Sequence, residues 1–390
     1  MHRRDFVLGS LAGALATAPI AARAADAGKA GGVPAGSWRD AAAPSSTCRL
    51  AATWRGASPD DPQQIGILDI DWAARTVNVH AAHRIPGRGH GLLAEDDGGV
   101  VAVAFRHGTW LWRLDAHGQP MRTVSLTDEP GGRHFAGHLV TSADGNALLT
   151  SEFDPHSGDG WIGVRDRDTL RKVDEWRCHG TDPHQMLLDR DGHLVIANGG
   201  VVRTPDGRKR DVSTMDSSLV LLDGRSGALR GQWRLPDRRL SLRHIAWNTL
   251  PDMDRPLLGV ALQAEHDDPA RRVESPVFAT WDGEQLHLPS RSADGGGYAG
   301  DISAVDGGFV VSCQQAQRAL WWRYDQPTQL TVIARMQHAG ALSPAPLAAG
   351  GVVIAGAKGI GRWHPRQPAA MLAWPQPMAL GSHWVELKTA

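Results

Sequence analysis

The chain has 390 residues, and its 41 Lys and Arg nearly balance its 42 Asp and Glu. This balance does not indicate binding to nucleic acid or to an anionic membrane, so we expect neither partner. Three cysteines lie far apart in the sequence and cannot all pair, which excludes a small disulfide-stapled domain.

Residues 1–24 have the pattern of an export signal. A twin-arginine sequence at residues 2–6 precedes a mildly apolar stretch, residues 7–22, and residues 22–24 offer a small-x-small cleavage site. An ordinary secretory signal is the alternative, but Phe6 and the weak apolar stretch favour the twin-arginine route. The stretch is too short for a membrane anchor. We therefore predict a periplasmic protein with no membrane span in its mature chain.

The segment after the signal, residues 25–44, is rich in Gly, Ala and Pro and is interpreted as a flexible linker. Without the signal, the chain keeps 38 basic and 41 acidic residues, a net charge of −3. We expect residues 45–390 to form a single domain, because repeats of one type run through this whole segment.

The repeated unit is a short apolar run that ends in an aspartate and a tight turn. The seven copies end at Asp71, Asp115, Asp166, Asp223, Asp282, Asp325 and a degenerate His364, with spacings of 44, 51, 57, 59, 43 and 39 residues. This length is typical of one four-stranded propeller blade, as in the WD-like repeats. A single blade cannot bury both faces, so the repeats must stack around an axis.

The rest of each repeat also predicts short antiparallel strands. Apolar runs flank Asp-Gly or Gly-Gly turns, for example at residues 143–146, 191–192 and 306–308, which are strong hairpin signals. No long segment after residue 25 has apolar residues at helical spacing. Fifteen Trp against two Tyr suit sheets packed face to face. The sequence predicts an all-β, seven-bladed β-propeller.

The two ends of the repeat region predict how the ring closes. Residues 48–53 have the pattern of a second strand, with no inner strand before them. The C-terminal run at residues 382–387 has the pattern of an inner strand with no blade of its own. Pairing the C-terminal strand with the first blade would complete that blade and remove two exposed sheet edges.

Histidines occur where the predicted inner strands begin. Seven positions are equivalent in this respect, and five of them are histidine: His90, His138, His184, His244 and His383. The other two are Asp301 and Gly340. Imidazoles arranged around one axis could hold a soft or borderline metal. The alternative is structural, since Gly-His pairs in WD-repeat propellers support hydrogen bonds inside each blade.

Polar residues occupy the expected ends of the second strands, which open on the same face as the histidines. We expect a ligand-binding funnel there, with contributions from neighbouring loops. The candidates are Arg133, His134, Glu152, Asn198, Arg243, Glu265 and Gln314. Blade loops are also polar merely because water reaches them. The sequence contains no nucleophile elbow, phosphate loop or CxxC motif that would identify a catalytic residue. Cys178 stands next to His179 in a predicted loop, and it is the one cysteine for which we consider a chemical role.

Several stretches together resemble a family of exported seven-bladed propellers, a domain of unknown function encoded beside imelysin-type iron-uptake proteins. The resemblance rests on residues 132–138, 151–154, 182–185, 195–200 and 241–244. It implies a propeller, export, and a link to iron acquisition or metal handling, but no reaction. The family usually has Glu-Asn-Asp at the stretch that corresponds to residues 152–154. This chain has Phe153 in place of the Asn and keeps Glu152.

The leading hypothesis is a periplasmic accessory protein of iron or other metal acquisition. Its funnel would bind a metal or metal complex, with iron, copper or haem as candidates and other periplasmic iron-uptake proteins as partners. An enzyme acting on a small molecule in the same funnel is the second hypothesis. The third is a protein-docking platform without a small ligand, and the sequence leaves the choice open.

Overall fold

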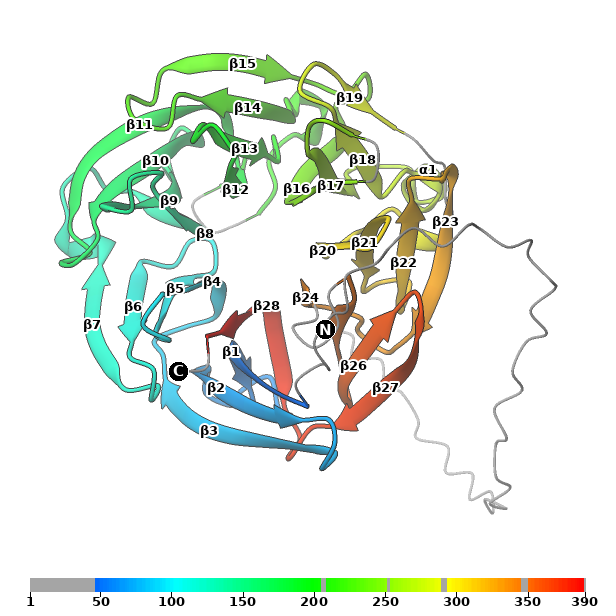
Figure 1. Cartoon of the computed structure of the whole chain (residues 1–390). Helices are drawn as coiled ribbons and strands as arrows, with labels where there is room; N and C mark the ends of the chain where they lie inside the picture. Colours follow the sequence, from blue (N-terminus) through cyan, green and yellow to red (C-terminus); the bar gives the residue numbers. More distant parts are fainter. Residues whose placement is uncertain (1–45, 205–207, 251–252, 289–292, 345–349, 389–390) are drawn as a thin grey trace, which may run out of the picture. The chain divides into compact units, whose positions relative to one another are not determined.

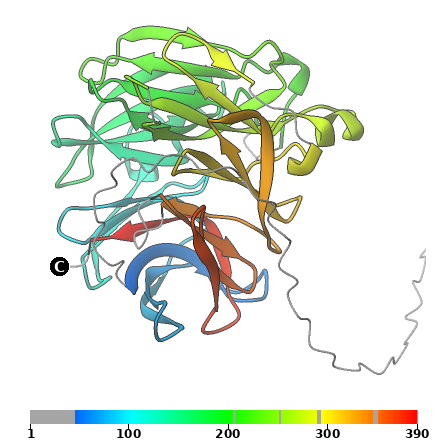
Figure 2. The same cartoon turned by 45° about the vertical axis from the view of Figure 1, so that its right-hand side comes forward.

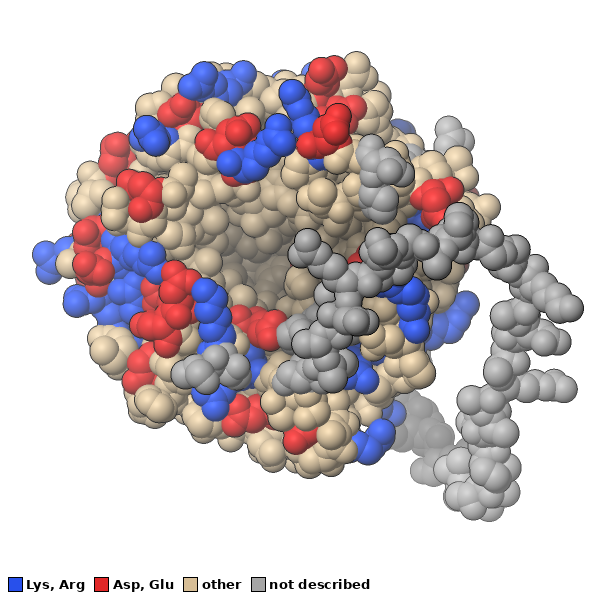
Figure 3. Space-filling view, in the orientation of Figure 1, with Lys and Arg blue, Asp and Glu red and all other residues tan. Residues whose placement is uncertain are grey.

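The computed structural model describes residues 46–204, 208–250, 253–288, 293–344 and 350–388. The predicted signal and linker lie outside these residues. The described residues form seven four-stranded antiparallel sheets arranged in a ring (Figure 1). The space-filling view shows a hollow at the centre of this ring, which we call the central channel (Figure 3). This arrangement confirms the predicted seven-bladed propeller.

Three blades contain the first half of the chain and its C-terminal strand. From the channel outward, the first blade contains β28 (Ala379–Leu387), β1 (Thr47–Arg55), β2 (Gln64–Asp71) and β3 (Thr76–Arg84). The second contains β4 (Gly89–Ala94), β5 (Val100–Ala104), β6 (Trp110–Leu114) and β7 (Pro120–Ser125). The third contains β8 (His134–Thr141), β9 (Ala147–Phe153), β10 (Asp159–Asp166) and β11 (Lys172–Thr181).

The remaining four blades follow the chain in order. The fourth contains β12 (Pro183–Leu188), β13 (Leu194–Asn198), β14 (Ser218–Leu222) and β15 (Leu229–Trp233). The fifth contains β16 (Leu240–Asn248), β17 (Leu257–Ala264), β18 (Phe278–Trp281) and β19 (Leu286–His287). The sixth contains β20 (Asp301–Val305), β21 (Gly308–Cys313), β22 (Arg318–Arg323) and β23 (Gln326–Arg335). The seventh contains β24 (Leu342–Pro344), β25 (Val352–Gly356), β26 (Gly359–His364) and β27 (Gln367–Ala373).

Helices are short and lie in the connections. The α-helix α1 (Pro269–Glu274) interrupts the β17–β18 connection, and Asp268 caps it by accepting a hydrogen bond from the Ala270 amide. Three single-turn 3-10 helices span Leu126–Asp128, Val212–Thr214 and Ala293–Gly295. Among the described residues, no helix is both long and apolar enough to cross a membrane.

The first blade closes the ring as the sequence predicts. Its inner strand β28 comes from the C-terminus and pairs antiparallel with β1, with Ala52 opposite Trp384 and Arg49 opposite Leu387. The two strands run side by side in both views, β28 in red and β1 in blue (Figures 1 and 2). This pairing leaves neither end of the ring with an unpaired inner edge.

In five blades the repeated aspartate accepts backbone hydrogen bonds in the turn between the third and fourth strands. Asp71 accepts hydrogen bonds at 2.9 Å from the amides of Ala73 and Ala74, and Asp223 accepts them from the two amides that follow Gly224. Such Asx turns fix the backbone with a local side chain. In the degenerate copy, Nδ1 of His364 accepts the equivalent hydrogen bond from the amide of Arg366 at 3.0 Å.

Aromatic and aliphatic side chains pack between neighbouring blades. Trp233 of the fourth blade lies 4.7 Å from Trp281 of the fifth, measured between ring centroids. Trp321 of the sixth blade similarly lies 5.1 Å from a tryptophan of the seventh. These contacts confirm that several tryptophans fill the spaces between blades. The cores between blades therefore hold the inner strands at fixed positions around the channel.

Candidate functional site

Five histidines from five blades meet in the central channel. The metal-ligating nitrogens of four of them lie within 4.8 Å of one another, and all four side chains are buried; the four are His90, His138, His244 and His383. The fifth, His184, places its Nε2 atom 3.0 Å from Nε2 of His244. The structure thus brings together every histidine that the sequence singles out as a candidate metal ligand.

A register irregularity accompanies each of these histidines. The pairing of β8 with β9 shifts between Phe135 and Leu139, a stretch that contains His138. Similar shifts occur around the other four histidines in β4, β12, β16 and β28. The remaining inner strands, β20 and β24, carry no histidine at this position, and their described pairs are regular. Bulges re-aim side chains, so we attribute the inward direction of the imidazoles to these irregularities.

Glycine permits the close approach of two of these strands. Gly137 has a φ of 111°, and a Cβ atom on it would lie 2.6 Å from Cδ2 of His90. A Cβ on Gly91 would lie 2.5 Å from the carbonyl oxygen of Gly137. A larger residue at either position would push the second and third blades apart or move the imidazoles.

Burial keeps four of the five imidazoles neutral. It holds the pKa of His90, His138, His184 and His244 well below the usual value of 6.5, and neighbouring histidines add to the effect. Neutral imidazole is the form that ligates metals. Among the described residues, both ring nitrogens of His90 and one each of His138, His244 and His383 are buried without a hydrogen-bond partner.

Two carboxylates support the histidine cluster, one by direct contact with a histidine and one through arginines. Asp301, which holds the equivalent inner-strand position in the sixth blade, lies with its Oδ2 atom 3.2 Å from Nδ1 of His383. That Oδ2 atom also accepts a hydrogen bond from the amide of Leu342 at 2.8 Å. A carboxylate behind an imidazole is the usual outer partner of a metal-ligating histidine, because it fixes the tautomer and the ring orientation.

The second carboxylate belongs to Asp182, two residues before His184. Asp182 has a φ of 54° and accepts hydrogen bonds from Arg106 at 3.0 Å and from Arg243 at 2.7 Å. Although burial acts in the opposite direction, Arg243 and Arg106 hold the pKa of Asp182 below its usual value. Arg106 also reaches Nδ1 of His184 at 3.3 Å. The ion pairs therefore fix the turn that presents His184 to the channel.

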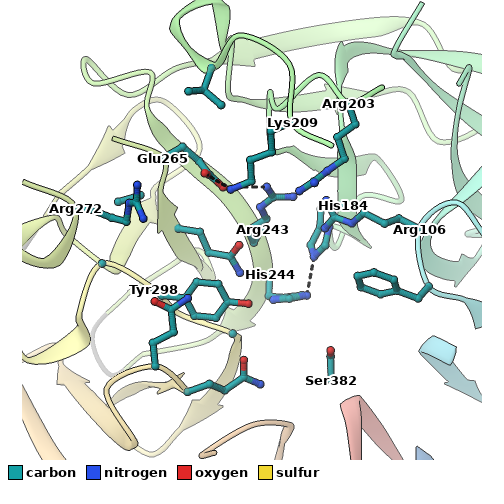
Figure 4. Close-up of a pocket in the computed structure, with 18 of the residues that line it drawn as sticks. Arg106, His184, Arg203, Lys209, Arg243, His244, Glu265, Arg272, Tyr298 and Ser382 are labelled. Carbon is teal, nitrogen blue, oxygen red and sulfur yellow. Dashed lines mark hydrogen bonds and ion pairs between the residues drawn. The ribbon is translucent and has the colours of Figure 1, made fainter. Parts of the chain in front are cut away.

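A pocket of about 640 Å³ opens directly beside the histidine cluster. His184, His244 and Tyr298 form part of its wall (Figure 4). His90 and several glutamines also line it. The described lining contains seven cationic side chains: Arg88, Arg106, Arg203, Lys209, Arg210, Arg243 and Arg272. It contains two carboxylates, Glu265 and Asp267.

Figure 4 views the propeller from the face opposite to that of Figure 1. Successive blades run clockwise in Figure 1 and anticlockwise in Figure 4. On the face shown in Figure 3, acidic and basic side chains are both scattered around the rim, and the central hollow is mainly uncharged. The cations of the pocket therefore gather at one end of the channel.

Three of the seven predicted ligand-binding residues line this pocket: Arg243, Glu265 and Gln314. Arg243 is 1% exposed and is held by Asp182, and its Nη2 lies 3.9 Å from Glu265. Glu265 also forms an ion pair with Lys209. These three residues, which the sequence predicts to lie in one funnel, thus line a single pocket.

The other four predicted ligand-binding residues lie away from the pocket. Glu152 is 0% exposed inside the third blade and forms ion pairs with Arg165 at 2.7 Å and with Lys172 at 2.6 Å. Arg133 is paired with Asp154 and Glu175 at the outer part of the same blade. The expected funnel contribution of this blade is thus replaced by an internal ion network, because β10 and β11 supply the partner charges.

The two remaining candidates make local hydrogen bonds. Nδ1 of His134 lies 3.0 Å from the carbonyl oxygen of His107. Asn198 is 0% exposed, donates to the carbonyl oxygen of Cys178 at 3.2 Å, and accepts from the Cys178 thiol at 3.2 Å. Cys178 itself lies in strand β11 and not in the predicted loop, and burial raises its pKa to about 12. Buried in this way, the thiol is structural.

Several pocket residues were not singled out as binding residues by the sequence. Arg203 and Lys209 lie in the long connection between β13 and β14, and α1 presents Arg272 from the β17–β18 connection. Burial lowers the pKa of Arg106 to about 10, so it remains cationic at neutral pH. The signal available in the sequence was the length of these two connections, which exceeds that of the Asp-Gly turns.

Residues 83–387 match the family described as "Protein of unknown function (DUF1513)". The chain belongs to this family. The match covers six blades and the strand that closes the ring, and so it includes all five histidines of the cluster. No curated protein matches the chain.

Solved propellers share the fold at low sequence identity. A Bacteroides fragilis protein provisionally named a 6-phosphogluconolactonase has a TM-score of 0.59 and 11% identity, with 88% of this chain and 98% of that chain covered. A Lactobacillus plantarum protein has a TM-score of 0.57 and 14% identity, covering 88% and 100%. Kuenenia stuttgartiensis hydrazine synthase has a TM-score of 0.54 and 13% identity, covering 84% and 96%. At these identities the likeness concerns the fold alone.

Proposed function

We propose that the propeller binds one transition-metal ion in its central channel through His90, His138, His244 and His383. The observation that carries this proposal is the mutual approach of four buried ligand nitrogens to within 4.8 Å. In a tetrahedral site with metal–nitrogen distances of about 2.0–2.1 Å, the four ligand nitrogens lie about 3.3 Å from one another. Small ring rotations would bring the nitrogens to that separation.

The hydrogen-bond inventory supports an ion at this position. A buried polar atom without a partner costs about 1–3 kcal/mol, and the four histidines together contain five such nitrogens. A cation shared among them would satisfy one nitrogen of each ring. Asp301 behind His383 and His184 beside His244 would support the ligands from outside.

The donor set selects the class of metal. Imidazole nitrogen suits zinc, copper and iron, whereas calcium and magnesium prefer oxygen. Haem would use two imidazoles on opposite sides of the iron, and the other two, within the same 4.8 Å, would collide with the macrocycle. We therefore favour a bare ion over haem, and we propose zinc, copper and iron as the metals to test.

We further propose that the protein works in the periplasm as an accessory to metal acquisition. The twin-arginine pattern at residues 2–6 supports export of a folded chain, and a channel site would already be assembled in such a chain. Replacing Arg3 and Arg4 together with Lys should retain the precursor in the cytoplasm. Unchanged export would remove the twin-arginine part of this proposal.

The metal site is tested by elemental analysis of the exported protein, purified without a His tag. We expect about one equivalent of zinc, copper or iron, and loss of that metal in the double variant His138→Ala/His244→Ala. Exposed His117→Ala is the matched control and should keep the metal. Isothermal titration of the stripped protein with each metal ion should give the same ranking of variants.

Two results would contradict the proposal. One is a wild-type protein that neither contains metal nor binds any of the three ions when titrated. The other is a double variant that binds as tightly as the wild type while both proteins melt normally, which would assign the histidines a structural role alone.

A further inference from the structure

We propose that the cationic pocket is a binding site for a small organic polyanion that carries two or three carboxylate groups. Its volume of about 640 Å³ lies within the range of about 300–1,000 Å³ typical of small-molecule sites. The inference goes beyond metal binding, because the pocket and its charges are present whether or not an ion occupies the channel.

The first argument is the excess of positive charge. Seven cationic side chains in the described lining face two lining carboxylates and one more, Asp182, which lies behind Arg106 and Arg243. One lining carboxylate, Asp267, is turned to Arg239, from which it accepts a hydrogen bond at 2.9 Å. A concave site with one sign of charge concentrates counter-ions of the opposite sign.

The second argument is that two of the guanidinium groups make hydrogen bonds to neutral acceptors. Arg88 donates to the hydroxyl of Ser382 at 2.8 Å and lies over the ring of Phe105 at 4.3 Å. Arg272 donates to the carbonyl oxygen of His266 at 2.7 and 3.0 Å. A ligand carboxylate would give either group a partner of opposite charge that can accept two parallel hydrogen bonds, which a hydroxyl or a carbonyl oxygen cannot do.

The third argument is the direction of the charges, which favours several carboxylates in one ligand. Arg88 precedes β4 in the second blade, Arg203 follows β13 in the fourth, and Arg272 belongs to α1 in the fifth. In Figure 4, Arg272 and Arg203 approach from opposite sides, with Tyr298 and Ser382 below them. A monocarboxylate meets one of these groups at a time, whereas a di- or tricarboxylate meets several.

The pocket also adjoins the histidine cluster. His90 and His244 belong both to the pocket wall and to the proposed metal ligands, so an anion in the pocket would lie against the proposed metal position. The hydroxyl of Tyr298 and the amide of Gln314 offer neutral hydrogen bonds to the uncharged part of the ligand. The pocket therefore has the charges for carboxylates and the neutral donors for the groups that join them.

Isothermal titration of citrate into metal-free protein tests this proposal. The metal is removed with phenanthroline, a neutral chelator that does not compete for an anion site, and the buffer is Tris chloride. We expect one citrate per chain, and weaker binding as ionic strength rises. Arg272→Gln and Arg88→Gln should each lower the affinity about tenfold, and Arg272→Lys should restore part of it. Arg122→Gln, an exposed arginine on β7, is the matched control and should bind like the wild type.

The trimethyl ester of citrate, which keeps the carbon skeleton but carries no charge, should not bind. No citrate binding at millimolar concentration, or equal binding by both pocket variants and the wild type, would overturn the proposal. Tighter binding of inorganic phosphate than of citrate would overturn the assignment to carboxylates. Because the protein is metal-free throughout, each outcome is independent of the metal test.

Discussion

At the residue scale, the histidine positions could be predicted because each repeats a structural position, whereas the partners of single polar residues could not. His90 and His138 mark equivalent inner strands, so the ring carries both to one axis. Glu152 carries the same kind of polar signal, yet a neighbouring strand supplies Arg165 and turns it into a structural residue. The partner of a charged residue depends on strand register and on packing. Neither can be predicted from the sequence of a single repeat.

Replacing Glu152 with Gln should therefore destabilise the fold and leave ligand binding intact. The side chain is 0% exposed and paired with the equally buried Arg165, so loss of the carboxylate should cost about 3 kcal/mol. Glu175→Gln, a more exposed member of the same network, should cost about 1 kcal/mol or less. Denaturant unfolding measures both. If the Glu152→Gln variant lost metal or citrate binding while its stability was unchanged, Glu152 would belong to the binding site and the assignment as structural would be wrong.

The cysteines should be unreactive in the folded protein. Burial raises the pKa of Cys48, Cys178 and Cys313 to about 12, so the reactive thiolate is scarce at pH 8. We expect almost no reaction with a thiol reagent at pH 8 in the native state, and three equivalents after denaturation. Because unfolding returns each thiol to a pKa near 9, these groups stabilise the fold below that pH and lose this contribution as the pH rises. Rapid native labelling of Cys178 would contradict its assignment as structural.

At the element scale, the strands were predictable and their irregularities were not. The spacing of the aspartates defines the third strand of each blade, since Asp71 and its equivalents close a local turn. The register shift around His138 occurs in the pairing of β8 with β9. Both strands contain runs of consecutive buried residues, so no alternation of apolar and polar residues marks the shift in the sequence. The connections that carry Arg203 and Arg272 differ in length from the corresponding connections of other blades. The repeat pattern therefore does not predict where these two side chains lie.

Deleting residues 379–390 tests the closing strand. The deletion removes β28, which pairs with β1 over most of its length and buries Trp384 and Leu387. Loss of Trp384 packing alone should cost about 3–5 kcal/mol, and the open ring should melt at a lower temperature or without cooperativity. Deleting only residues 388–390, which removes an exposed ion pair between Lys388 and Asp96, should change little. Equal melting of the two truncated chains and the intact chain would contradict closure by β28.

At the scale of the whole molecule, the ring turns scattered sequence positions into one site. The ligands of the proposed metal site come from the first, second, third and fifth blades, from His90 to His383 along the chain. No two of them are neighbours in sequence, so the site exists only when the ring is closed. The cationic pocket lies at one end of the same channel, and the scattered charges of Figure 3 surround the other. We infer that ligands enter at the cationic end.

Anomalous diffraction from crystals of the metal-loaded protein tests the central claim most directly. Data collected on both sides of the absorption edge of the bound metal locate the ion without reference to any assumed site. We predict one anomalous peak in the channel, about 2.0–2.1 Å from a nitrogen of each of His90, His138, His244 and His383. A peak elsewhere, for example at the surface group Asp189, Asp191 and His193, or no peak in the channel of a protein that contains metal, would contradict the account.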